Sequence, residues 1–447
     1  MPNSAPPKQE LRRDIGVTGI VALGLGTAVG VSVYSVLAPA TQLAGAAMIV
    51  SMLLAMVPML IYAIIYGFMG AAVPVTGASY EWPRRFVHPF LGFIISWLRI
   101  AGSTSAVIVL TMVLVSYAGA FVALPLKPTM FGLLVFVLVV NVLGVSAAAR
   151  SQGVMLAILL GTCALFAFGS VPSIQMSNFE PFASHGVLGV FAAVPLLISL
   201  FLGIESATEV GGEVKNPSRS IPLGISISIV LTAIVYLLVA VAALGVLGPE
   251  KLGSSSAPLL DAGIAAFGPA GRYLIVASAV VAIGSSINAT FIIMSRFLYA
   301  MAREGMLPAA LAKVSGKHDV PLAAIICAFA FCCVGLFLPE NLVFLFLAVN
   351  IPTILKYSAT CLAAVGLLRR RPDLYEAARF RPAKWMIYSL AVAGVGLGIL
   401  IIIAGWSADW RPYALLLAWA FMGCVYYLIM RHRSAAGAAR AIPVTSE

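Results

Sequence analysis

The sequence predicts an all-α polytopic membrane protein with about twelve transmembrane helices. Of its 447 residues, 62% are hydrophobic and only 10% are charged, whereas a soluble protein carries roughly a quarter charged residues. The mean hydropathy is +1.06, and apolar runs of roughly 20 residues recur along the chain. A surface that faces water cannot be built from so few charges, so we expect most of the surface to face the lipid bilayer.

The expected helices follow one another, separated by polar or Pro/Gly-rich breaks. Runs of this length favour helices, because the strands of a membrane barrel alternate over roughly 10 residues. We expect one transmembrane domain over residues 15–431, between cytoplasmic tails at 1–14 and 432–447. Its first repeat would cover 15–172, its second 187–368, and two extra helices 384–431. The apolar spans are 15–39, 46–70, 90–121, 128–145, 152–172, 187–209, 220–247, 271–300, 320–338, 341–368, 384–405 and 411–431.

The orientation follows from the basic residues between the spans. An even number of helices places both termini on one side, and that side carries about 20 of the 27 Lys and Arg residues. The opposite loops have only Lys127, Lys251, Arg272 and Arg411. The positive-inside rule therefore places both termini in the cytoplasm, and we expect a plasma or inner cell membrane.

Several classes of protein are disfavoured by the same residues. The net charge of +11 comes from basic residues at the ends of apolar spans rather than on a soluble module, so we expect no nucleic-acid partner. The six cysteines fall inside apolar runs without metal-ligand spacing, which predicts no metal site and no cofactor. An enzyme is not expected either, because the histidines lie in loops or at helix ends: His88, His185, His318 and His432.

Two of the expected spans contain an interruption. The first holds the glycine-rich stretch Gly24–Ser32, where a helix can unwind at mid-membrane or, alternatively, pack closely against a neighbour. The sixth holds Phe201–Glu213, with the carboxylate of Glu205 inside an apolar run. Such a carboxylate costs several kcal/mol and is a functional candidate by default. The alternative is that this span ends near Gly203 and that Glu205 is interfacial.

The two interruptions occur in the first and the sixth span. A five-helix unit repeated in inverted orientation places its two first helices side by side, and broken helices at matching positions indicate a transporter site. Unwound backbone offers N–H groups to an anion and carbonyl groups to a cation. A zwitterion with a carboxylate and an ammonium group one carbon apart fits such a pair.

The residues at these interruptions resemble the amino acid–polyamine–organocation (APC) superfamily of permeases. The first stretch, Gly26-Thr27-Ala28-Val29-Gly30-Val31-Ser32-Val33-Tyr34, is similar to the family's first-helix pattern, although Ser32 replaces its last glycine. Three further motifs match in order: Pro74–Tyr80, then Phe201–Glu205 followed by Glu213–Pro222, and Ser295–Pro308. The resemblance covers about Asp14 to Arg371 and implies a leucine-transporter-like 5+5 inverted repeat with discontinuous helices 1 and 6.

The resemblance also implies a substrate site between those two helices. The substrate carboxylate would meet backbone N–H groups around the first interruption, and the ammonium group would meet carbonyls of both. Phe201 matches an aromatic residue that closes over the substrate in the family, or it is an ordinary packing residue. The implied site residues are Gly26, Thr27, Ala28, Val29, Gly30, Ser32, Leu200, Phe201, Gly203, Ile204 and Glu205.

The driving ion stays open between a proton, sodium and exchange. Arg99 and Lys356 lie deep in apolar spans and are predicted to balance Glu205, to titrate, or to form a structural ion pair. The lysine that replaces sodium in some relatives is absent from the fifth span, where Ala157 stands. Polar residues of the eighth span offer oxygen ligands or pack between helices: Ser285, Ser286 and Asn288. Polyamine or organocation uptake is the runner-up function, and a channel is less favoured.

Overall fold

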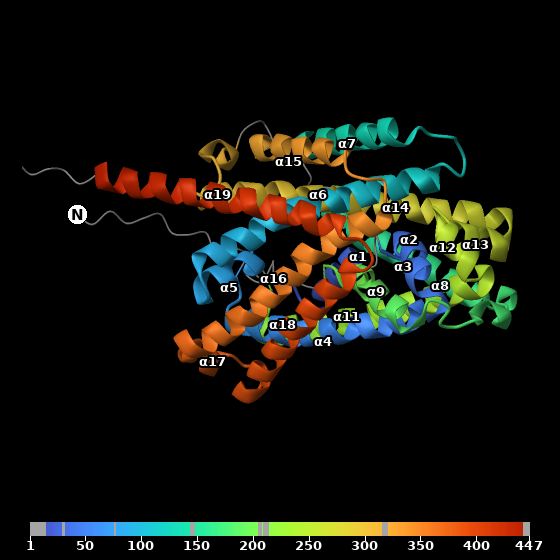
Figure 1. The fold of residues 1–447 in the computed structure, drawn as a ribbon, viewed down its shortest axis with the longest axis horizontal. Coiled ribbons are helices and arrows are strands. Elements are labelled where there is room, and N and C mark those ends of the chain that lie inside the picture. Colours follow the sequence, from blue (N-terminus) through green and yellow to red (C-terminus); the bar gives the residue numbers. More distant parts are fainter. Residues whose placement is uncertain are drawn as a thin grey trace, which may run out of the picture.

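The computed structural model describes residues 15–28, 32–75, 77–143, 148–203, 208, 214–314 and 321–440. Within these ranges every extended regular element is a helix, and one isolated parallel bridge joins Ile15 to Val214. Figure 1 shows an elongated bundle in which the long helices run roughly along the long axis. The all-α class that the sequence predicts is therefore the class of the described chain.

In the part of the chain that the structure describes, seven helices or helix combinations are long and apolar enough to cross a bilayer. Shorter apolar helices lie between them, among them α7 (Leu126–Leu143), α8 (Ala148–Gly169) and α15 (Leu322–Gly335). This composition is that of a multi-pass membrane protein. The long ones are Leu37–Ala72, which contains α3 (Leu37–Ala44) and α4 (Met48–Ala72), then α6 (Pro89–Ala118), α11 (Pro217–Leu247), α14 (Pro269–Arg303), α16 (Leu342–Arg370), α18 (Lys384–Trp406) and α19 (Arg411–Arg440).

Burial divides these helices into a centre and a periphery. In the most apolar stretch of α6, 78% of the residues are buried inside the protein, and in that of α16 the share is 72%. The shares fall to 28% in α18 and 17% in α19, whose large apolar side chains remain exposed, as expected of side chains that face lipid. Helix α16 packs against both α6 and α18, while α11 packs against α4 and α1 (Val17–Ala28).

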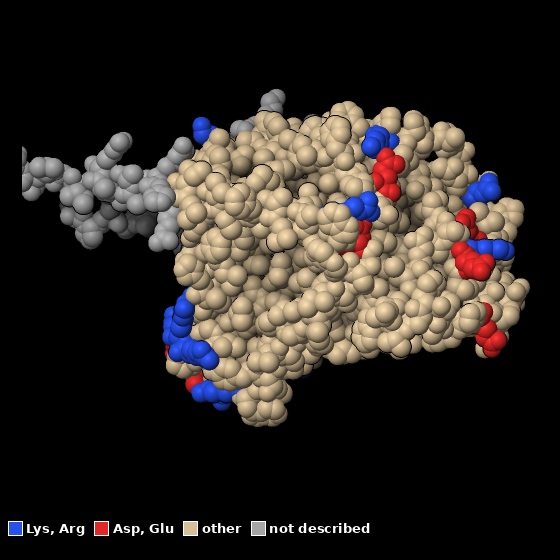
Figure 2. Space-filling model, in the orientation of Figure 1, with Lys and Arg blue, Asp and Glu red and all other residues tan. Residues whose placement is uncertain are grey.

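The two ends of the bundle differ in charge. Helices α5 (Ala78–Phe86) and α17 (Pro372–Ala377) lie at one end, and α12 (Pro249–Ser254) and α13 (Pro258–Phe267) lie at the other (Figure 1). Figure 2 shows Lys and Arg gathered at the end that carries α17. At that end Glu81 bonds Arg84 at 3.1 Å and Arg85 at 2.5 Å, and burial raises the pKa of Tyr80 to about 12 against the opposing effect of Arg84.

The expected spans and the helices differ at the first span and in the loops, where the short helices α5, α12, α13 and α17 lie. The first span, expected over 15–39, consists of α1, α2 (Ser32–Ser35) and α3, and helix continues to Ala44 because the chain turns only at Gly45, whose φ is +60°. Helix α13 lies in a stretch that we expected to be a loop. It is ten residues long, begins at Pro258 and ends before Gly268, so its apolar run is too short to indicate a span.

Helices α13 and α14 approach each other at two glycines. A Cβ atom added at Gly271 would lie 2.0 Å from the carbonyl oxygen of Gly263, so the two backbones are in direct contact. Small residues permit this approach in membrane proteins. A Cβ added at Gly284, further along α14, would meet nothing within 4 Å.

We predict that Gly271→Ala destabilises the protein, whereas Gly284→Ala does not. Overpacking at the first position costs about 1–3 kcal/mol, because backbone and not a side-chain end must move. At the second position, alanine is the better helix former. Thermal unfolding of both variants in detergent measures the difference, and equal melting temperatures would contradict the close contact.

Candidate substrate site

The first interruption lies between α1 and α2. Helix α1 is described up to Ala28 and α2 from Ser32, and Gly26 and Thr27 lie in the described part of α1. Val29, Gly30 and Val31 lie outside the described residues. Ala28 is buried, and its carbonyl accepts a hydrogen bond of 2.5 Å from the hydroxyl of Tyr236 in α11. This hydrogen bond ties α1 to α11 beside the predicted site residues.

The second interruption begins at the end of α9 (Gly186–Leu197). The chain passes from α9 into the 3₁₀ turn η4 (Ile198–Phe201) and then leaves helical conformation. Leu202 is extended, with φ −66° and ψ 137°, and Gly203 has φ +96°, a conformation that favours glycine. Leu200 and Phe201 are buried, while Ile204 and Glu205 lie outside the described residues.

The fold brings the two interruptions together. Both α1 and α2 contact η4, although more than 160 residues separate them in the sequence. A second contact ties the same segments: the backbone N–H of Lys215 donates to the carbonyl of Ile15 at 2.8 Å. The described parts of the predicted site therefore converge in the interior of the bundle.

The polar candidates of α14 make structural hydrogen bonds. The hydroxyls of Ser285 and Ser286 each donate to the carbonyl of Ala282 at 2.9 Å, one turn back in the same helix. Asn288 accepts a hydrogen bond of 2.8 Å from the amide of Asn141 in α7. These contacts correspond to the helix-packing interpretation of the three residues.

The two deep cations lie on the central helices. The guanidinium carbon of Arg99 in α6 lies 5.4 Å from the ring centroid of Phe297 in α14. Lys356 in α16 is 4% exposed, and its Nζ lies 4.9 Å from the ring centroid of Tyr357. The Tyr357 ring in turn contacts Tyr62 of α4 at 5.0 Å. Both cations thus lie over aromatic faces, an arrangement that stabilises positive charge in low dielectric.

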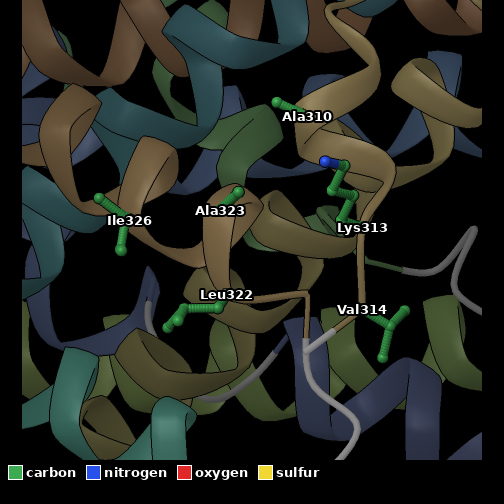
Figure 3. A pocket seen from close by; sticks show the side chains of 6 residues that line it. All are labelled: Ala310, Lys313, Val314, Leu322, Ala323 and Ile326. Atoms are coloured by element: carbon green, nitrogen blue, oxygen red, sulfur yellow. The ribbon is translucent and has the colours of Figure 1, made fainter. Parts of the chain in front are cut away.

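A surface pocket lies elsewhere. Figure 3 shows a pocket of about 620 Å³ between η6 (Ala309–Ala312) and the first turns of α15. One charged side chain, Lys313, projects at its edge among apolar groups. None of its lining residues belongs to the predicted site. Among the described residues, no group of three His, Cys, Asp or Glu side chains is placed to hold a metal ion.

Two residues that hold the interruptions were not found from the sequence. Tyr236 caps α1, and Asn350 of α16 donates its amide to the carbonyls of Pro195 and Leu196 in α9. Each is a single polar residue in a long apolar span. Hydropathy alone does not show toward which neighbour such a side chain points.

A bundle of long apolar helices, with the described parts of the predicted site in its interior, is the architecture of a multi-pass membrane protein. The chain belongs to the amino acid permease family, whose sequence model matches residues 15–421. This match confirms the resemblance to the APC superfamily and makes the protein a multi-pass membrane transporter rather than an enzyme.

Individual relatives support the same assignment. The chain is 26% identical over 454 residues to a branched-chain amino acid permease of Bacillus subtilis, with 94% of each chain covered. It is 24% identical over 459 residues to a methylthioribose transporter of the same organism, with 95% of each covered. An uncharacterized transporter of Mycobacterium tuberculosis is 30% identical over 319 residues, which cover 70% of this chain and 71% of the relative.

We predict that Tyr236→Phe lowers uptake more than Tyr62→Phe does. Both substitutions remove one buried hydroxyl that donates to a backbone carbonyl, that of Ala28 for Tyr236 and that of Gly394 for Tyr62. Loss of one such hydrogen bond costs about 0.5–1.5 kcal/mol in either case. Only the first substitution removes a contact with a predicted site residue, Ala28. The initial uptake rate per inserted molecule measures the effect. An equal loss of uptake in both variants would contradict a role of Tyr236 at the site.

Proposed function

We propose that this permease is a secondary active transporter that moves amino acids across the cell membrane by alternating access. The meeting of α1, α2 and η4 in the buried interior carries this proposal. The substrate carboxylate would bind backbone N–H groups from Gly26 to Ser32, chiefly those of Ala28, Val29 and Gly30. The ammonium group would bind carbonyls at the end of α1 and near Leu200, Phe201 and Ile204, beside Gly203 and Glu205.

The proposed fold is the 5+5 inverted repeat with about twelve spans. Its two units would cover 15–172 and 187–368, with extra helices at 384–431. The low burial of α18 and α19 supports a peripheral position for those extra helices. The gathering of Lys and Arg at the α17 end supports a cytoplasmic location of that end and of both tails.

The proposed substrate is a neutral amino acid with an apolar side chain. Among the described residues with buried side chains, Lys356 is the only charged one, and the rest of the polar set consists of Ser, Thr and Asn. A cationic substrate or a polyamine requires several carboxylates, and of the glutamates in the second interruption only Glu205, with Glu209 as a second candidate, is proposed to be available to the site. The branched-chain amino acid permease among the relatives supports the same substrate class.

Purified protein should be stabilised by branched-chain or other apolar amino acids, and not by agmatine or polyamines. Binding raises the melting temperature by mass action, so thermal shift identifies ligands without assuming a mechanism. In proteoliposomes, the same ligands should drive counterflow of labelled substrate. Stabilisation by polyamines alone would favour the organocation alternative, and flux without saturation or counterflow would favour a channel.

The coupling step is proposed to involve one of the two deep cations, Lys356 or Arg99. A proton or a sodium ion remains compatible with the proposal, and so does exchange. Lys356 is the stronger candidate for carrying a proton, because a lysine side chain can release its proton whereas an arginine side chain stays protonated. Tyr357, Tyr66 and Tyr62 surround the same part of α16 and α4.

We predict that Lys356→Met flattens the dependence of uptake on external pH, whereas Arg99→Met preserves it. A guanidinium stays protonated at all accessible pH values, so Arg99 cannot carry the proton. Both variants remove one long cationic side chain and serve as a matched pair. Full uptake with unchanged pH dependence in Lys356→Met would exclude titration of this lysine.

A further inference from the structure

Asn350 connects the central helix α16 to the end of α9. The residue is fully buried, and its Nδ2 donates to the carbonyl oxygens of Pro195 at 2.7 Å and Leu196 at 3.2 Å. Both carbonyls belong to the last three residues of α9, just before the chain enters η4. The amide therefore caps the carboxyl end of α9 from another helix.

This cap meets a physical requirement of the interruption. The last four carbonyls of an α-helix have no N–H partner within the helix. At an end exposed to water, solvent satisfies them, but in the interior of a membrane protein each unsatisfied group costs several kcal/mol. At the end of α9 the N–H of Ile198 donates to Val194 and Leu196, and Asn350 supplies a donor to Pro195 and a second one to Leu196.

The other half of the Asn350 amide is left without a partner. Its Oδ1 is buried, and no described residue donates a hydrogen bond to it. A buried acceptor without a donor destabilises a protein and is uncommon. An apolar residue of the same size would avoid this cost, so the N–H groups of Asn350 account for its presence at this position.

Helix α16 is a firm support for such a cap. It packs along α6, and a Cβ atom added at Gly102 would lie at an ordinary contact distance of 3.5 Å from the ring of Pro352, two residues after Asn350. It also contacts η4 directly. The position of Asn350 is therefore fixed, and the end of α9 is fixed through it.

We propose that Asn350 is a positioning residue of the substrate site. By holding the carbonyls of Pro195 and Leu196, it sets where α9 ends and thereby where Leu200 and Phe201 present their backbone to the substrate. The proposal rests on the proposed function for its transport consequence. Its structural part concerns the backbone of 195–203 and does not depend on the substrate.

The chain contains a matched control. Asn141 in α7 is 1% exposed, and its Nδ2 donates two hydrogen bonds of 2.8 Å, to the Val137 carbonyl and to Asn288 Oδ1. Its own Oδ1 is also buried without a hydrogen bond. Asn141→Leu and Asn350→Leu therefore remove the same groups from two different places. Asn350→Ala removes the same amide without added bulk or charge and serves if the leucine variant fails to insert.

The first measurement is hydrogen–deuterium exchange of the full chain in nanodiscs without substrate. Asn350→Leu should speed exchange at least about tenfold in peptides that cover residues 195–203, because the cap no longer holds the end of α9. Asn141→Leu should leave these peptides unchanged. Unchanged exchange in Asn350→Leu, or an equal increase in both variants, would overturn the positioning role.

The second measurement is uptake of an amino acid that stabilises the wild-type protein. Asn350→Leu should raise KM about tenfold with a smaller effect on the maximal rate, while Asn141→Leu should keep KM within about twofold. An unchanged KM in Asn350→Leu overturns the link to the site. Absence of uptake by the wild-type protein contradicts the proposed function instead, and the exchange experiment still decides the structural part.

Discussion

The structure depends on one constraint: inside a bilayer, every backbone N–H and C=O group needs a partner from the protein. A continuous helix meets this demand by itself, but a helix that ends in the interior does not. Here α9 and η4 leave helical conformation among buried residues, and neighbouring helices donate hydrogen bonds to carbonyls of α9 and of α1. Tyr236 of α11 bonds the carbonyl of Ala28, and Asn350 of α16 bonds those of Pro195 and Leu196.

The same solution recurs where α2 meets the end of the bundle formed by α12 and α13. The hydroxyl of Tyr117 in α6 donates to the carbonyl of Tyr34 at 2.9 Å and accepts from the N–H of Leu259 at 3.3 Å. Leu259 lies in the first turn of α13, where N–H groups also lack helical partners. The hydroxyl of Tyr34 shares a hydrogen bond of 2.7 Å with Ser278 of α14. Short helices around the site are thus joined to long helices through single tyrosine hydroxyls, each of which can donate and accept at once.

The sequence was sufficient for the long elements and for the place where the chain leaves helical conformation after Phe201. The span expected at 271–300 is helix α14, and Gly203 has the positive φ that its position at the second interruption requires. Hydropathy could not predict α13, because ten residues between Pro258 and Gly268 are too few for a span. Hydropathy also could not show that Asn350 and Asn288 have different partners, since both are single amides in apolar helices. Only packing shows that Asn350 faces carbonyl groups of α9, whereas Asn288 faces Asn141.

The chemistry of these caps suits a protein that must change conformation. A hydrogen bond between neutral groups contributes about 0.5–1.5 kcal/mol net, because partners are exchanged rather than created. A buried ion pair would cost several kcal/mol to separate. Within the described core the capping residues are neutral, and the single buried charge, Lys356, lies over the ring of Tyr357. The ends of α1 and α9 can therefore exchange a protein donor for a substrate ammonium group or a water at little cost. In the proposed cycle, this small free-energy cost allows the site to open to either side of the membrane.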